Sequence, residues 1–173
     1  MKVFKFGGAS VKDAESVRNV ASVLKRFPNE NIIVVISAMG KITNALEKLT
    51  DAFFFSAERR SPSILADRKD DPNKILAEII SYHFDIIKKL FPDNSHSVYS
   101  DVNSVFEEIK KRISTAPSDN YNSEYDQIVS QGEIISTKIV SAYLNTAGIN
   151  SHWMDAREMI QTDSNYREAN VNF

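Results

Sequence analysis

The first stretch of the chain that could do chemistry is KFGGAS, at residues 5–10. Two adjacent glycines follow a short, partly apolar run that contains Lys5. Glycines let backbone N–H groups approach an anion closely, a helix that begins after them adds partial positive charge, and the lysine adds a full one. These features predict a phosphate cradle. The alternative is a tight strand-to-helix turn with a solvated lysine, since neither Gly-x4-Gly-Lys nor Gly-x-Gly-x-x-Gly spacing occurs here.

A second candidate is SAMGKITN, at residues 37–44, directly after a branched apolar run. Ligands of open parallel sheets bind beyond the carboxyl ends of the strands, where this stretch is expected to lie. Its small residues leave room, while Ser37, Thr43 and Asn44 offer hydroxyl and amide groups. The alternative is a plain loop in which Thr43 caps the next helix.

Two later stretches, SQGE at residues 130–133 and WMDAR at residues 153–157, complete the set. Gly132 interrupts a helical pattern, which predicts a helix start or a close approach by another group. Glu133, near that start, could hold an ammonium group, or could simply cap a solvated turn. Asp155 and Arg157 follow another predicted strand and could face the same crevice, although a surface ion pair is the alternative.

The remaining reactive residue types give no further site. The chain has no cysteine, which excludes disulfides, thiolate nucleophiles and cysteine-ligated zinc. The three histidines lack metal-ligand spacing, and His83 is expected to pack among its aromatic neighbours. No metal site is predicted from these residues.

The elements that must position these stretches begin with a strand–helix–strand unit. Residues 2–6 predict a strand, and apolar residues at three- and four-residue spacing from Val11 predict a helix with Ser10 as its N-cap. The continuous branched run at residues 32–36 predicts a parallel strand buried on both faces. A right-handed crossover would join the two strands.

The rest of the chain is predicted to be mainly helical. The expected elements are helices at residues 43–55, 75–90, 98–113 and 123–145, a polar surface excursion at 56–73, a short strand at 149–154 and the start of a helix at 156–161. The fold class is therefore α/β, helix-rich, with at least three strands. Three strands make a small sheet for so many helices, so we expect further strands beyond residue 173.

Composition predicts a single globular domain over residues 1–173. Hydrophobic residues make up 42% and charged residues 25%, and the net charge of −2 comes without a large block of one sign, which argues against a nucleic-acid partner. No apolar run approaches the roughly 20 residues that span a bilayer, and Lys5 with the glycines interrupts any signal-peptide core. We expect a cytoplasmic protein without a membrane partner.

The four stretches together resemble the aspartokinase branch of the amino acid kinase family. The resemblance is carried by KFGGAS, VISAMGKITNAL, SQGEIIS and MDAREMIQTD, in this order, and spans residues 2 to 163 with least support across residues 56–122, which are variable and helical in the family. It implies a parallel-sheet sandwich of the amino acid kinase (carbamate kinase-like) type, of which this chain is the N-terminal half. KITNAL resembles in particular the branch fused to homoserine dehydrogenase.

The resemblance also implies a reaction, in which ATP with Mg²⁺ phosphorylates the β-carboxylate of L-aspartate to 4-phospho-L-aspartate. This is the first step toward lysine, threonine and methionine, and the full-length enzyme is expected to be a homo-oligomer. By analogy Lys5 pairs with the transferring phosphate. The other roles implied are a backbone cradle at Gly7, Gly8 and Ser10, substrate neighbours at Ser37 and Ala38, and substrate contacts at Thr43, Glu133 (to the α-amino group) and Arg157.

The chain departs from the family pattern in two respects. Ala9 stands where a threonine or serine is usual, and the later Gly-Arg-Gly-Gly-Ser-Asp-like segment, the nucleotide-binding half and the regulatory ACT domains are absent. We therefore expect these 173 residues to be inactive alone. The alternatives are another small-acid kinase of the same fold, acting on glutamate, carbamate or a nucleotide, and a non-catalytic folding or oligomerisation unit.

Overall fold

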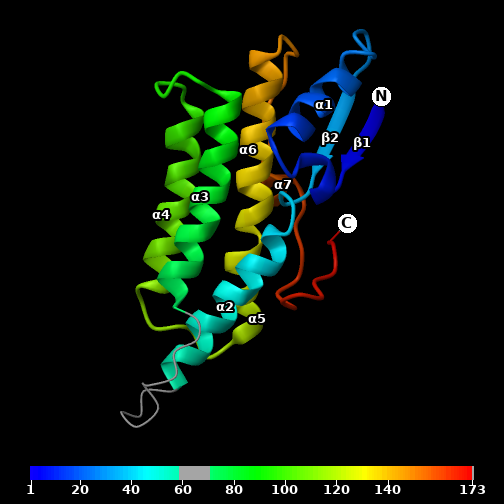
Figure 1. Cartoon of the computed structure of the whole chain (residues 1–173). Helices are drawn as coiled ribbons and strands as arrows, with labels where there is room; N and C mark the ends of the chain where they lie inside the picture. Colours follow the sequence, from blue (N-terminus) through cyan, green and yellow to red (C-terminus); the bar gives the residue numbers. More distant parts are fainter. Residues whose placement is uncertain (59–70, 173) are drawn as a thin grey trace.

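The computed structural model describes residues 1–58 and 71–172 and has a small parallel sheet beside a set of long helices (Figure 1). In this part of the chain, β1 (Lys2–Phe6) and β2 (Ile32–Ile36) form the sheet, with Lys2 opposite Ile32 and Phe6 opposite Ile36. Both strands and their parallel pairing confirm the sequence prediction. Because the strands are parallel and in register, the segments that follow Phe6 and Ile36 leave the sheet at the same edge.

In the described part of the chain, only one face of the sheet is covered by other elements. Phe4 and Phe6 pack against the core, whereas Ile33 and Val35 are 48% and 43% exposed. The prediction that β2 is buried on both faces is therefore wrong. A continuous branched run identifies a strand, but burial of each face depends on which elements pack against it.

The first helix, α1 (Ala14–Leu24), starts later than predicted. Residues Gly8–Val11 form a 3-10 turn, η1, and the N-cap is Asp13, whose carboxylate accepts a hydrogen bond from the Ser16 backbone nitrogen at 2.8 Å. This hydrogen bond holds the pKa of Asp13 below its usual value. The predicted start at Val11 and cap at Ser10 are wrong, because Asp13 is the residue with extended backbone and a carboxylate within reach of the first turn.

The long helices confirm the predicted helical regions. They are α2 (Ile42–Glu58), α3 (Pro72–Leu90), α4 (Val98–Ile113), α5 (Tyr121–Val129) and α6 (Gln131–Thr146), followed by the short α7 (Ala156–Met159). The helix predicted over residues 123–145 is divided between α5 and α6 at Ser130. Of the predicted excursion at 56–73, residues 59–70 lie outside the described part of the chain.

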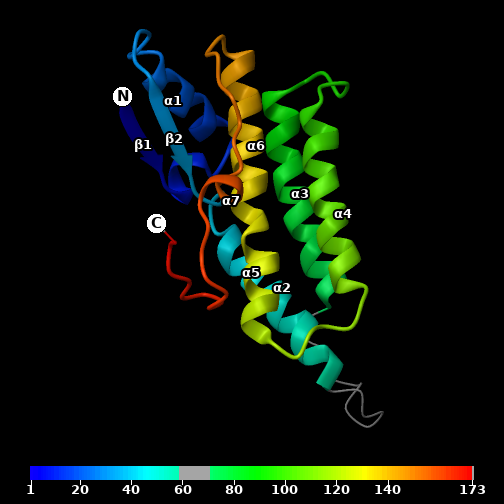
Figure 2. The same cartoon turned by 180° about the vertical axis from the view of Figure 1, so that it is seen from behind.

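Helix α6 occupies the centre of the arrangement. It runs between the unit of β1, β2 and α1 on one side and the α3–α4 pair on the other (Figures 1 and 2), and it contacts α1, α2, α4, α5 and β2. Its buried residues include Ile135, Ile139, Val140 and Leu144. Because α6 has this many neighbours, the SQGE stretch at its start lies among other elements of the fold.

The third strand predicted at residues 149–154 does not form. The backbone of Ser151 instead forms hydrogen bonds with the side chain of Asn145. That side chain accepts from the Ser151 N–H at 2.9 Å and donates to the Ser151 carbonyl at 3.0 Å. A strand needs a neighbouring backbone as its partner. None of the described elements offers one here, so a side chain satisfies these groups.

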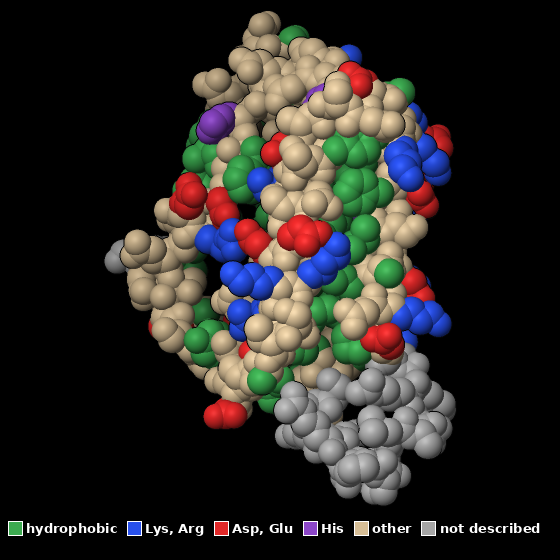
Figure 3. Space-filling model, turned by 90° about the vertical axis from the view of Figure 1, so that its left-hand side faces the viewer, with side chains coloured by type: hydrophobic (Ala, Val, Ile, Leu, Met, Phe, Trp, Pro, Cys, Tyr) green, Lys and Arg blue, Asp and Glu red, His purple; other side chains and the backbone are tan. Residues whose placement is uncertain are grey.

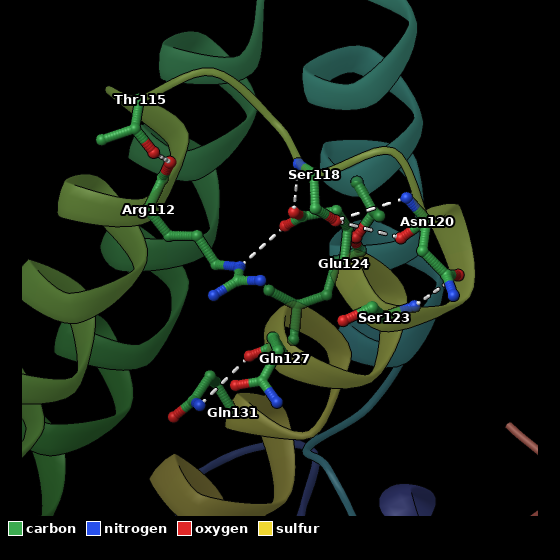
Figure 4. Close-up of polar contacts among 10 residues, drawn as sticks. Arg112, Thr115, Ser118, Asn120, Ser123, Glu124, Gln127 and Gln131 are labelled. Carbon is green, nitrogen blue, oxygen red and sulfur yellow. Dashed lines mark hydrogen bonds and ion pairs between the residues drawn. The ribbon is translucent and has the colours of Figure 1, made fainter. Parts of the chain in front are cut away.

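A partly buried ion pair joins α4 to α5 (Figure 4). The Arg112 Nε donates to the Glu124 carboxylate at 2.7 Å, and the backbone nitrogen of Ser118 donates to its other oxygen at 2.7 Å. The Glu124 side chain is only 3% exposed. Burial raises the pKa of Glu124, but the hydrogen bonds from Ser118 and Arg112 outweigh it and hold the pKa below its usual value.

The charged surface is mixed in sign. On the face shown in Figure 3, basic and acidic side chains lie among one another without a large area of either sign, as a net charge of −2 would suggest. None of the helices in the described residues is both long and apolar enough to cross a membrane.

Candidate functional site

Two loops meet at the carboxyl edge of the sheet: the glycine loop (residues 7–13) after β1 and the SAMG loop (residues 37–41) after β2. The Ser37 N–H donates to the Phe6 carbonyl at 3.1 Å, and the Gly40 N–H donates to the Gly8 carbonyl at 2.9 Å. A Cβ added at Gly8 would lie 2.6 Å from the Ala38 carbonyl oxygen and 2.8 Å from that of Gly40. These are backbone atoms that cannot give way locally, so Gly8 is required for the two loops to lie this close.

The glycine loop leaves backbone donors free. In the described residues, the N–H groups of Gly7, Gly8 and Ala9 have no hydrogen-bond acceptor. A Cβ added at Gly7 would meet no atom within 4 Å, so the space beside its backbone is open. Successive free N–H groups beside open space can receive an anion. Ser10 differs, because its N–H donates to the Gly7 carbonyl at 2.8 Å and only its hydroxyl remains available.

Lys5 lies at the same edge, on the exposed face of the sheet. Strand side chains alternate, so Lys5 points away from the face on which Phe4 and Phe6 pack, and it lies opposite Val35 in the register. Its side chain is exposed and makes no ion pair with any described residue. A free ammonium group one residue before the end of β1 suits a ligand held by the glycine loop.

The start of α6 approaches the SAMG loop closely. A Cβ at Gly132 would lie 3.0 Å from the Leu46 Cδ1 atom of α2 and 3.1 Å from the Ala38 Cβ atom. Both predictions for Gly132 are thereby confirmed, since it lies in the first turn of α6 and another segment approaches it closely.

Two side chains of α6 bind the SAMG loop directly. The Glu133 carboxylate accepts a hydrogen bond from the Ala38 N–H at 3.3 Å, and the Ser136 hydroxyl donates to the Ser37 carbonyl at 2.8 Å. Ser136, which is fully buried, was not predicted as a site residue. The sequence could have indicated Ser136 by its position three residues after Glu133, because that spacing places both side chains on one face of a helix.

In the described residues, no hydrogen bond or ion pair joins the side chains of Thr43 and Arg157 to these loops or to Glu133. Thr43 is half-buried in the first turn of α2, which begins at Ile42, so Thr43 is not the N-cap. Arg157 lies on α7 and pairs with the Asp155 carboxylate at 2.6 Å, which confirms the surface ion pair that the sequence left open. The Arg157 side chain is 60% exposed and lines an open hollow of about 610 Å³ at the chain's C-terminal segment.

The WMDAR stretch is nevertheless attached to α6. The Trp153 Nε1 donates to the Thr137 hydroxyl at 2.9 Å, and the Lys138 ammonium lies 4.1 Å from the centre of the Trp153 ring. The Thr137 hydroxyl in turn donates to the Glu133 carbonyl at 2.8 Å. Figure 2 shows α7 lying over α6. The stretch therefore adjoins the helical turn that carries Glu133.

The family of the chain follows from a comparison with known proteins. The model of the amino acid kinase family matches residues 1–172. The chain belongs to the amino acid kinase family. This agrees with the arrangement of the site, in which three stretches of the predicted set meet at the carboxyl edge of a parallel sheet, and with the α/β fold expected from the sequence.

Within the amino acid kinase family, the relatives that resemble this chain include aspartokinases. The chain is 34% identical over 163 residues to the chloroplastic aspartokinase 1 of Arabidopsis thaliana, covering 93% of this chain and 26% of that protein. It is 26% identical over 166 residues to the bifunctional aspartokinase/homoserine dehydrogenase 2 of Escherichia coli (strain K12), covering 94% of this chain and 18% of that protein. The chain thus spans about a quarter or less of these relatives.

A solved kinase structure has the same fold. Aspartokinase III of E. coli superposes with a TM-score of 0.79 at 26% identity, covering 99% of this chain and 35% of that one. That enzyme has been solved with lysine and aspartate and, separately, with aspartate and ADP. The N-terminal part of an aspartokinase fold is therefore what the chain forms.

The described residues offer no cluster of three or more His, Asp or Glu side chains that could hold a metal ion.

Proposed function

We propose that the chain carries the aspartate-binding and phosphate-positioning part of an aspartate kinase. The observation that carries this proposal is the junction of separate stretches of sequence at one edge of the sheet. The glycine loop is bonded to the SAMG loop through Gly8 and Gly40, and the SAMG loop is bonded to α6 through Ala38 and Glu133. This brings anion donors and a carboxylate to the same place.

The arrangement suits transfer of a phosphoryl group to a carboxylate. Such a reaction needs the reactants held in line and the charge on the phosphate oxygens neutralised, with little covalent chemistry by the protein. The free N–H groups at residues 7–9 and the Lys5 ammonium supply positive charge. The Glu133 carboxylate, which is half-buried, supplies a counter-charge for the α-amino group of L-aspartate. ATP would supply the phosphoryl group.

Mg²⁺ remains an expectation from the family resemblance. Since the described residues contain no carboxylate cluster for it, we assign it no protein ligand and no step. Ser10, Ser37, Thr43 and Arg157 also stay proposed ligand contacts. The Arg157 guanidinium would have to leave Asp155, or bind a ligand through its unpaired edge.

The test of this function is a binding and turnover experiment. Calorimetry should detect L-aspartate bound more tightly than L-glutamate, while an ADP-release assay with L-aspartate and Mg-ATP should show no turnover by these 173 residues. A longer chain that includes the Gly-Arg-Gly-Gly-Ser-Asp-like segment should turn over. Robust turnover by the 173 residues would contradict the proposed inactivity, and tighter binding of L-glutamate would favour another small-acid kinase.

Several finer expectations stay predictions. The steps toward lysine, threonine and methionine, a homo-oligomeric parent and fusion to homoserine dehydrogenase concern the whole protein. A cytoplasmic location is likewise a prediction, since the relatives include chloroplastic proteins. A non-catalytic folding unit would be favoured if Lys5→Ala left every ligand signal unchanged.

A further inference from the structure

Tyr82 of α3 contacts the glycine loop from a distant part of the sequence. Its hydroxyl donates to the Lys12 carbonyl at 2.5 Å, although the two residues lie 70 positions apart. Lys12 directly precedes Asp13, the N-cap of α1. The hydroxyl therefore holds the end of the glycine loop at the point where α1 begins.

The same hydroxyl lies against the SAMG loop. Gly40 has φ of +56°, and a Cβ added there would lie 2.7 Å from the Tyr82 hydroxyl oxygen and 3.7 Å from the Lys12 Cβ atom. The hydroxyl thus occupies the space left by a glycine in a left-handed turn. One side-chain oxygen contacts both loops that form the candidate site.

Tyr82 is half-buried and packs against the core. The next residue, His83, is fully buried and its ring contacts the Ile79 carbonyl oxygen through Nδ1 at 2.8 Å. The rings of Tyr82 and His83 lie edge to face, with centres 5.2 Å apart. Burial, aided by the nearby Asp13 charge, raises the pKa of Tyr82. The hydroxyl therefore keeps its proton, and so its donor, at neutral pH.

We propose that Tyr82 is a positioning residue of the candidate site, whose hydroxyl sets the spacing between the glycine loop and the SAMG loop. This inference rests on the proposed function. The direct bond between the loops joins Gly8 to Gly40, and the Tyr82 hydroxyl adds a hydrogen bond to Lys12 and lies against Gly40. With both in place, the free N–H groups at residues 7–9 keep their alignment with Ala38 and Glu133.

The variant that tests this is Tyr82→Phe, which removes the hydroxyl and keeps the ring. The matched control is Tyr99→Phe, because the Tyr99 hydroxyl also donates to a backbone carbonyl, that of Phe91, at 2.8 Å. Each variant loses one hydrogen bond of the same type. The two should therefore lose similar stability, measured by urea unfolding. Any other difference between them would then come from the place of the hydroxyl in the fold.

Two further measurements separate positioning from stability. Amide hydrogen exchange should become faster in peptides covering residues 7–13 and 37–41 of Tyr82→Phe, and remain unchanged there in Tyr99→Phe. In a longer chain that includes the nucleotide-binding half, calorimetry with L-aspartate and with ATP should show about threefold to tenfold weaker binding by Tyr82→Phe. The control should bind both ligands as the unmodified chain does.

Unchanged exchange in both peptides of Tyr82→Phe would overturn the inference. Faster exchange with unchanged affinities would also overturn it, since Tyr82 would then have only a structural role. If the unmodified chain binds neither ligand, the proposed function is wrong for this chain. The exchange comparison would still decide whether the hydroxyl holds the two loops together.

Discussion

The carboxylate of Glu133 accepts a hydrogen bond from the backbone nitrogen of Ala38 at 3.3 Å, across 95 positions of the chain. The bond fixes the start of α6 against the loop that follows β2. One carboxylate oxygen is used in this contact, so the other can face a ligand. Glu133 therefore joins two elements and offers charge to the site, and these two roles can be tested separately.

Replacing Glu133 by glutamine should separate these roles. Glutamine keeps an oxygen that can accept from the Ala38 N–H, so the free energy of unfolding should change by less than about 1 kcal/mol. The negative charge is lost, so L-aspartate should bind at least about tenfold more weakly by calorimetry. The control is Glu78→Gln on the exposed surface of α3, and equal affinities for all three chains would contradict the ammonium contact.

The two neighbouring glycines should respond differently to alanine. Gly8→Ala should lower the free energy of unfolding by about 2 kcal/mol or more, because its Cβ would lie within 3 Å of two backbone oxygens. Gly7→Ala should leave stability unchanged or slightly raised, since its Cβ meets no atom within 4 Å and its backbone is extended. Denaturant unfolding measures both.

Gly7→Ala should instead weaken the binding of ATP, because a methyl group would enter the open space beside the free N–H groups. Calorimetry with ATP, on a longer chain that includes the nucleotide-binding half, would detect this. Wild-type affinity in Gly7→Ala would show that the phosphate does not approach there.

Stability should fall as pH decreases below 6.5 because of His83. Burial lowers its pKa from the usual 6.5 to about 4, so the unfolded chain takes up a proton before the folded chain does. The stabilisation is complete above pH 6.5 and is lost progressively down to pH 4, by about 3 kcal/mol in all. Urea unfolding at a series of pH values measures it.

His83→Leu should flatten this part of the pH profile, since leucine does not titrate. His152→Gln is the control, because His152 is exposed. A profile of the same slope in His83→Leu and the unmodified chain would assign the acid sensitivity to other groups.

Breaking the partly buried ion pair of α4 and α5 should destabilise the fold. Arg112→Leu should cost about 2–4 kcal/mol, because the buried Glu124 carboxylate would keep only the Ser118 N–H as partner. The double variant Arg112→Leu/Glu124→Leu should be more stable than Arg112→Leu. Lys110→Ala, which breaks an equally short but exposed pair with Glu107, should cost less than about 1 kcal/mol.

Local patterns predicted the elements well, and contacts between distant residues limited the rest. The branched run at Ile32–Ile36 and the spacing of Ile75, Ile79 and Ile87 are local patterns, and the structure contains both predicted elements. The exposure of Ile33 depends on what packs over it, which periodicity does not encode. The absent third strand has the same cause, since pairing requires a neighbour elsewhere in the chain.

In the candidate site too, local patterns were predictable and contacts between distant residues were not. The glycines and Glu133 were predictable from residue type and from a family resemblance, whereas Tyr82 lies in a region judged variable and gave no local signal. Its role appears only when α3 is placed against the two loops. The N-cap predicted at Ser10 is wrong because a second capping residue, Asp13, lies three positions later, and local rules favour both.

The bare face of the sheet has a consequence for handling the protein. Val3, Ile33 and Val35 are 64%, 48% and 43% exposed on it, and in the described residues each strand also has an unpaired edge. Such a surface favours pairing between molecules as concentration rises. Ultracentrifugation over a dilution series should therefore show self-association, which Val35→Lys would reduce by placing a second ammonium group opposite Lys5.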